Sequence, residues 1–212
     1  MKACEMPAAT NPLRIALIGA ESTGKTQLST DLAAHFQRLG YAVHQVSEQL
    51  RVWCDEHGRT PWQHEQQQIA QNQADAALQG WHADVLIADT TPLMVAVYSD
   101  VIFGDASLYE AALAHQRRYD ITLLLAPDLP WVADGFQRDG AHVRAPVDAL
   151  LRAALRRADL DFYSVSGSGP LRLAAALAAI ERAQHWPWRL GVPPEELSGP
   201  ERAEITQPPE RA

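Results

Sequence analysis

The stretch IALIGAESTGKTQL, residues 15–28, decides the fold class. Residues 19–26 match the pattern G-x-x-x-x-G-K-[ST]. The match follows a short apolar run and precedes a segment with apolar residues at helical spacing, at Leu28, Leu32 and Phe36. Glycines let the backbone wrap closely around a phosphate group, with amides directed inward at a helix N-terminus. The stretch is therefore predicted to hold a nucleoside triphosphate, and the alternative is a glycine turn that merely ends a strand.

The predicted ligands of this loop are ATP and Mg²⁺. Lys25 is expected to reach the β and γ phosphates, and the Thr26 hydroxyl is expected to bind the metal ion. The chain has only one other lysine, Lys2, so most of its positive charge is arginine. The residues predicted to contact the nucleotide are Gly19, Ala20, Glu21, Ser22, Thr23, Gly24, Lys25, Thr26 and Gln27.

Composition indicates one ordinary globular domain in 212 residues, 47% of them hydrophobic and 21% charged. The net charge of −8 argues against sequence-independent binding of nucleic acid or anionic membrane, which needs clustered Lys and Arg. Cys4 and Cys54 match no zinc or redox spacing, and no run approaches the ~18 apolar residues that span a bilayer. A soluble, cytoplasmic protein is expected, and its oligomeric state, a homo-oligomer included, stays open.

Strand and helix patterns alternate along the chain, which predicts a three-layer α/β/α fold of the P-loop NTPase kinase type around a mostly parallel five-stranded sheet. Residues 1–12 are expected to be a flexible N-terminus, 13–186 the domain with a lid loop at about 128–145, and 187–212 a partly disordered tail. The expected strands are 14–19, 41–46, 84–90, 119–127 and 161–167. The expected helices are 25–38, 61–81, 146–160 and 170–186, with shorter ones around 93–98 and 108–117.

Acidic residues follow two of these strands, where ligands of parallel sheets bind. Asp89 closes the third strand and is predicted to steady Mg²⁺ directly or through water. The alternative for Asp89 is a turn-forming residue. Glu48 follows the second strand and is positioned to accept the proton of an attacking hydroxyl, while Arg51 would anchor a substrate or phosphate. For this pair the alternative is a capping acid with a surface ion pair.

The segment 128–145 combines glycines with charged residues, including Arg138 and Arg144. Glycine hinges and arginines are typical of a lid that closes over phosphates and excludes water, and the alternative is a flexible surface loop. Trp53, Trp62 and Trp131 are candidates to stack on a flat heterocycle, although core packing is the favoured explanation for each one taken alone.

The chain resembles the ribosylnicotinamide kinase domain of the NadR-type bacterial NAD-biosynthesis proteins and their stand-alone relatives, often labelled AAA-family ATPases. The resemblance runs from about Leu13 to Ile180. The segments that carry it are GAESTGKT (19–26), EQLR (48–51), QIAQNQ (68–73), IADT (87–90) and DITLLLAPDLPWVADG (120–135).

The resemblance implies a kinase fold in which the strand bearing Asp89 lies beside the strand of the phosphate loop. It also implies γ-phosphoryl transfer from ATP to the 5′-hydroxyl of nicotinamide riboside, which gives nicotinamide mononucleotide. It assigns catalysis to Lys25, Glu48, Asp89 and Arg138. It places Glu48, Arg51, Asp89 and Trp131 at the acceptor, with Arg138 or Arg144 closing over the phosphates.

Three positions depart from the family pattern. Val52 stands where the family tends to have Glu, and Thr91 stands where the family has a second acidic residue. Gln137 replaces an expected lid arginine. These changes concern the acceptor side and the lid rather than the ATP loop. Two other functions therefore stay open, a kinase for another nucleoside or a sugar, and a switch module that binds and slowly hydrolyses ATP. From a length of 212 residues, the DNA-binding and adenylyltransferase domains of multifunctional relatives are not expected in this chain.

Overall fold

The computed structural model describes residues 12–80, 82–132 and 140–183. Five parallel strands form one sheet in the order β2-β3-β1-β4-β5. Their bounds are β1 (Leu13–Ile18), β2 (Val43–Val46), β3 (Val85–Asp89), β4 (Ile121–Leu125) and β5 (Tyr163–Val165). All five predicted strands are present, with ends within two residues of the expected ones.

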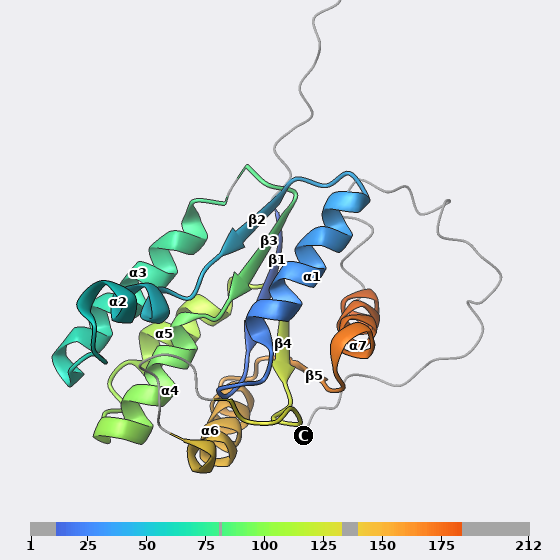
Figure 1. The fold of residues 1–212 in the computed structure, drawn as a ribbon. Helices are drawn as coiled ribbons and strands as arrows, with labels where there is room; N and C mark the ends of the chain where they lie inside the picture. The colour runs from blue at the N-terminus through green and yellow to red at the C-terminus, as the bar shows by residue number, and fades with distance from the viewer. Residues whose placement is uncertain (1–11, 81, 133–139, 184–212) are drawn as a thin grey trace, which may run out of the picture.

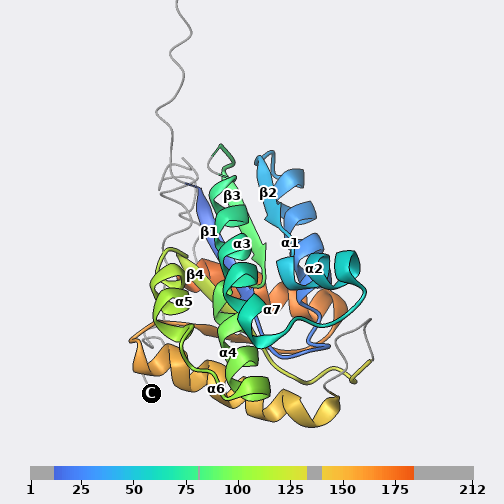
Figure 2. The same cartoon turned by 90° about the vertical axis from the view of Figure 1, so that its left-hand side faces the viewer.

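Helices cover both faces of the sheet, so the predicted three-layer architecture is confirmed (Figures 1 and 2). One face carries α1 (Lys25–Arg38) and α7 (Gly169–Arg182). The helices around the other face are α3 (Gln66–Leu78), α4 (Pro92–Phe103), α5 (Tyr109–Gln116) and α6 (Arg144–Arg157). A further helix, α2 (Gln49–His57), packs on α3.

The strand β1 shows why the fold needs both layers. Ile15 and Leu17 belong to the core under α1 and α7, whereas Ile18 belongs to the core under α4 and α6. Successive side chains of a strand point to opposite faces, so a strand that is apolar throughout must be covered on both sides. Burying these side chains removes them from water, which is the main stabilising contribution to the fold.

The carboxyl ends of β1, β2 and β3 come together because the strands are parallel and in register. Leu17 pairs with Asp89, and Val46 pairs with Ala88. The strand that carries Asp89 therefore lies directly beside the strand that leads into the phosphate loop, as expected. This edge of the sheet also receives Glu48, which is the N-cap residue of α2.

Three local expectations need correction. Helix α2 was not predicted, because only one of its residues, Cys54, is buried and its apolar pattern is weak. The glutamine-rich helix begins at Gln66, after a 3₁₀ turn at Gln63–Glu65, rather than at residue 61. Residues 141–145 are helical instead of loop, since a 3₁₀ turn at Ala141–Val143 leads into α6 and buries Val143.

Some expectations lie outside the described residues: the flexible N-terminus up to residue 11, lid residues 133–139 and the tail 187–212. Among residues 12–80, 82–132 and 140–183, no helix is long and apolar enough to cross a membrane.

One histidine makes the stability of the fold depend on pH. His115 is partly buried near the end of α5, and its ring packs edge-on against Tyr119 with ring centroids 5.6 Å apart. Burial lowers the pKa of His115, and the charge of Arg118 lowers that pKa further. The unfolded chain therefore takes up a proton near pH 6.5 while the folded chain resists it, so acidification favours unfolding.

We predict that the melting temperature falls as the pH is lowered from 7.5 to 5.5, and that His115→Phe reduces this fall. Phenylalanine keeps the ring packing but cannot titrate. Thermal denaturation of both proteins at several pH values measures the effect, with the exposed His64→Gln as control. An identical pH dependence in wild type and His115→Phe would contradict the assignment.

Candidate functional site

The turn from β1 into α1 is built by glycines at positions where a side chain does not fit. A Cβ on Gly19 would lie 2.8 Å from the carbonyl oxygen of Leu125. Gly24 has φ +77°, a left-handed conformation that favours glycine, and it caps the N-terminus of α1. The loop between Gly19 and Gly24 therefore packs closely against the end of β4, and it leads into the first turn of α1.

The side chain of Lys25 binds to the backbone of this loop. Its ammonium group donates hydrogen bonds to the carbonyl oxygens of Gly19 at 2.9 Å and Ala20 at 3.1 Å. The buried hydroxyl of Thr23 also donates to the Ala20 carbonyl, at 2.8 Å. The side-chain amide of Gln27 donates to Asp31 on the same helix at 2.9 Å, and its contact with the nucleotide stays a prediction.

Thr26 and Asp89 form the pair predicted for a metal ion. The Thr26 hydroxyl donates to Asp89 Oδ2 at 2.6 Å. Asp89 is only 6% exposed, and its other oxygen, Oδ1, is buried with no hydrogen-bond partner among the described residues. A buried carboxylate oxygen without a partner costs free energy unless something binds it. One carboxylate and one hydroxyl suit Mg²⁺, which prefers oxygen ligands and completes its shell with water and phosphate oxygens.

A buried arginine braces the loop from outside. Arg172 of α7 is 4% exposed, and its guanidinium donates to the carbonyl oxygens of Thr23 and Gly167, each at 2.7 Å. It also pairs with Asp128, which accepts a hydrogen bond from the Gly167 amide at 2.7 Å. The loop is thereby joined to the segments that follow β4 and β5. Arg172 was not among the predicted residues, and its charge within the otherwise apolar run 170–180 is the signal that could have found it.

The start of the predicted lid rests on the same loop. The Ser22 hydroxyl donates to the Val132 carbonyl at 2.9 Å, and the Val132 amide donates back to the Ser22 oxygen at 3.1 Å. The indole of Trp131 donates to Glu21 at 3.4 Å. Trp131 thus contacts the phosphate loop instead of lining the neighbouring pocket.

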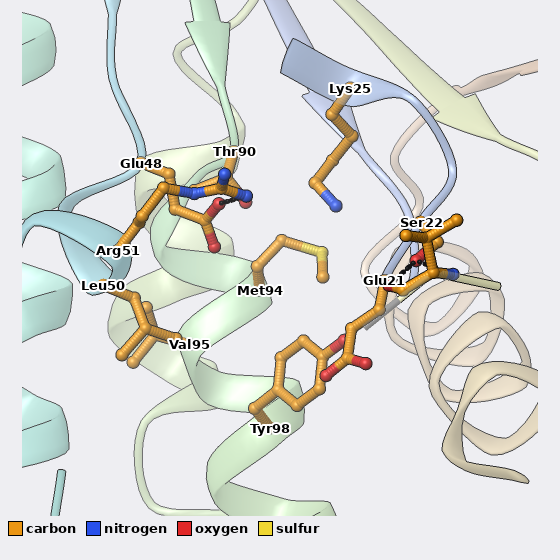
Figure 3. Close-up of a pocket in the computed structure, with 11 residues that line it drawn as sticks. Glu21, Ser22, Lys25, Glu48, Leu50, Arg51, Thr90, Met94, Val95 and Tyr98 are labelled. Atoms are coloured by element: carbon orange, nitrogen blue, oxygen red, sulfur yellow. Dashed lines mark hydrogen bonds and ion pairs between the residues drawn. The ribbon is translucent and has the colours of Figure 1, made fainter. Parts of the chain in front are cut away.

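A pocket opens beside the loop, between α2 and α4 (Figure 3). Its polar end is formed by Lys25, Glu48, Arg51 and Thr90. Arg51 Nη2 lies 3.4 Å from Glu48 Oε2, which makes the two residues an ion pair. The Glu48 side chain is mostly buried, while that of Arg51 is exposed. Leu50, Met94, Val95 and Tyr98 form a more apolar wall. Glu21, Ser22 and Val132 complete the lining, with the Glu21 carboxylate next to Tyr98 (Figure 3). The pocket thus places polar side chains beside an apolar wall, a combination that suits a ligand with both polar and apolar parts.

The remaining predicted residues are spread around this centre. Arg144 begins α6 and is 9% exposed, and its Nε and Nη2 atoms are buried without hydrogen-bond partners in the described part of the chain. Arg138 and Gln137 lie outside the described residues. An exposed Val52 and a buried Thr91 lie outside the pocket lining, and the Thr91 hydroxyl donates to Gln116 at 2.7 Å.

Two of the three tryptophans form a separate cluster. Trp53 stacks on His57 with ring centroids 4.0 Å apart. The Arg59 guanidinium lies 4.8 Å from the Trp53 ring and 5.3 Å from the Trp62 ring. The two tryptophan rings thus contact His57 and Arg59, and neither tryptophan lines the pocket.

Solved structures share this fold at low sequence identity. A structure of NadR protein in complex with NAD and AMP-PNP matches with a TM-score of 0.66 and 16% identity, covering 81% of this chain and 49% of the NadR chain. NadR in complex with NR matches with a TM-score of 0.62 and 15% identity, over 81% and 50% of the two chains. This chain thus spans about half the length of the NadR chains that it matches.

A deoxyadenosine kinase from M. mycoides matches with a TM-score of 0.53 and 14% identity, over 81% of this chain and 99% of the kinase. Comparison with functionally curated proteins finds no match. The predicted P-loop kinase fold and the resemblance to the NadR-type domain are therefore confirmed at the level of the fold. Residues 14–172, most of the chain, match the family described as AAA domain, and the chain belongs to this family.

Proposed function

We propose that this protein is an ATP-dependent kinase that phosphorylates the 5′-hydroxyl of nicotinamide riboside. The observation that carries the proposal is one edge of the sheet, where a phosphate loop with a metal-type pair borders a pocket containing a carboxylate. A kinase needs both halves, since one must hold ATP and the other must hold an acceptor hydroxyl at the γ-phosphate. The solved NadR structures, which share the fold, contain AMP-PNP and NAD in one case and NR in the other.

In this proposal the loop residues 19–26 hold the phosphates of ATP. Lys25, which now lies on the Gly19 and Ala20 carbonyls, would turn its ammonium group to the β and γ phosphates. Thr26 and Asp89 would hold Mg²⁺, which neutralises charge on the transferring phosphoryl group. Arg144 offers a buried guanidinium with two nitrogen atoms that no described residue satisfies, which suits a phosphate oxygen on lid closure.

Glu48 is assigned to the acceptor hydroxyl. The hydroxyl oxygen bonds to the γ-phosphorus while the bond from that phosphorus to the bridging oxygen of ADP breaks. The proton of the hydroxyl passes to the Glu48 carboxylate. Arg51 holds Glu48 in place through their ion pair, and the apolar wall from Leu50 to Tyr98 would receive the ring of the nucleoside. Positioning and charge neutralisation would account for most of the rate.

Another nucleoside acceptor is the second candidate. Leu50, Met94 and Val95 form one apolar wall of the pocket, which would also accept other flat rings, and the fold is shared with a deoxyadenosine kinase. A module that hydrolyses ATP slowly without an acceptor is the candidate from another class. Hydrolysis without an acceptor would not require the pocket that contains Glu48.

The decisive experiment is mass spectrometry of reactions with ATP, Mg²⁺ and a panel of nucleosides led by nicotinamide riboside. We expect a product heavier by one phosphate with nicotinamide riboside. Phosphorylation of a different member of the panel would name another acceptor and keep the kinase. ATP hydrolysis with no phosphorylated nucleoside would replace the proposal with the switch module.

Lys25→Ala is predicted to reduce kcat by about 10²- to 10³-fold, the usual effect of removing one preorganised charge from a phosphoryl-transfer site. The fold should survive with a change of about 1 kcal/mol or less, because the two hydrogen bonds of the ammonium group among the described residues both go to carbonyls of the loop. Steady-state kinetics and thermal denaturation measure the two effects. Arg38→Ala, an exposed change on the same helix, is the control. Normal turnover in Lys25→Ala would refute the phosphate-loop assignment.

Glu48→Gln is predicted to reduce kcat by about 10²-fold or more while ATP binding stays within about twofold of wild type. The amide keeps the size of the side chain but cannot accept a proton as the carboxylate does. Kinetics and isothermal titration with a non-hydrolysable ATP analogue separate the two quantities. Glu56→Gln, exposed on the same helix, provides the matched control. An undiminished rate would remove Glu48 from the acceptor site.

A further inference from the structure

Gln73 of α3 differs from the exposed glutamines of the same helix. Gln68 and Gln71 are exposed and donate to Asn72 and Asp75, one turn further along the same helix. Gln73 is fully buried, with 0% of its surface exposed. A primary amide has two donors and two acceptor positions, so its burial is unfavourable unless other groups satisfy them. The partners of Gln73 therefore indicate what its side chain does.

Those partners are backbone groups at the ends of β2 and β3. Gln73 Oε1 accepts a hydrogen bond from the Gln49 amide at 2.8 Å. Gln73 Nε2 donates to the Ser47 carbonyl at 3.3 Å and to the Thr90 carbonyl at 3.4 Å. Ser47 and Gln49 are the two residues that flank Glu48. One buried side chain thus holds the backbone on both sides of Glu48 and joins it to the residue after Asp89.

The contact with Thr90 occurs where the backbone is strained. Thr90 has φ +85°, which is unfavourable for a β-branched residue. Such conformations are energetically unfavourable and persist only where surrounding contacts hold them. The Thr90 amide donates to the Leu17 carbonyl at 3.0 Å, and its carbonyl accepts from Gln73. Thr90 also lines the pocket, so its conformation shapes the acceptor site.

We propose that Gln73 is a positioning residue that sets where the Glu48 carboxylate lies relative to the Thr26–Asp89 pair. The inference rests on the proposed kinase function for its catalytic consequence. Glu48 follows β2 and Asp89 ends β3, and Gln73 is a side chain that bonds to the segments after both strands. Without these bonds the peptide groups around Glu48 can shift, and the strained Thr90 segment can relax. None of these three hydrogen bonds reaches the phosphate loop, so we expect the loop to keep its affinity for ATP.

Gln73→Met tests the proposal, because methionine fills nearly the same volume without hydrogen-bonding to the backbone. We expect kcat for the acceptor nucleoside to fall at least about tenfold, with the KM for ATP within about twofold of wild type. Gln71→Met on the exposed side of the same helix is the matched control and should behave as wild type. A wild-type kcat in Gln73→Met would overturn the proposal. A rise in the KM for ATP as large as the fall in kcat would also overturn it.

Hydrogen exchange provides a second readout that does not depend on activity. The amide of Thr90 bonds to Leu17, and Gln73→Met does not remove that bond. We expect this amide to exchange about fivefold faster or more in Gln73→Met, with no change in Gln71→Met, because the segment is released. Equal exchange in all three proteins would show that Gln73 only fills space. If the wild type phosphorylates no nucleoside, the proposed function fails, and the exchange result still decides whether Gln73 holds these strand ends.

Gln49→Pro covers the case in which Gln73→Met does not fold. Gln49 is the first residue of α2, where proline is well accepted, and Glu48 before it is already extended. The change removes the amide that donates to Gln73 and leaves the core intact. We expect kcat to fall in the same direction, by about threefold or more, with the KM for ATP unchanged. A wild-type kcat in a folded Gln49→Pro protein would overturn the proposal.

Discussion

The hydrogen bond between Thr26 and Asp89 is the contact on which the site depends, and it exists only because β1 and β3 are neighbours. The two residues are 63 positions apart in the chain. The parallel pairing of Leu17 with Asp89 brings the carboxylate to the start of α1, where the phosphate loop ends. A sheet with another strand order would separate the two groups, and the loop would lose its acidic partner.

Around this contact the protein keeps several polar groups in place by burying them. Arg172 braces the outer side of the loop, and Gln73 holds the strand ends next to Glu48. Two other buried groups have no such partners in the described part of the chain, Asp89 Oδ1 and the Arg144 nitrogens Nε and Nη2. A buried carboxylate oxygen without a partner suits a cation, and a buried guanidinium without a partner suits an anion. In the proposed function, Mg²⁺ would bind Asp89 and a phosphate of ATP would bind Arg144.

Much of the architecture could be predicted because the signals for it are local. Glycine spacing identifies the turn after β1, and continuous apolar runs identify the buried strands. Helix α2 gave no comparable signal, since a helix that buries only Cys54 has almost no apolar periodicity. The site followed the same division. Asp89 and Glu48 were predicted as site residues because they lie at or just after the end of a strand, whereas Gln73 and Arg172 were not predicted, because their partners are backbone groups far away in the sequence.

The phosphate loop, the α/β class and the residues at the strand ends follow from local sequence, because each depends on the chemistry of neighbouring positions. Which of those residues meet depends on the folded chain as a whole. The fold brought Thr26 to Asp89 and placed Glu48 and Tyr98 in one pocket, while it left Trp53 and Trp62 to stack with Arg59 elsewhere. The reason is physical: strand order and helix packing arise from burying apolar surface over the whole chain, and no short stretch contains that information.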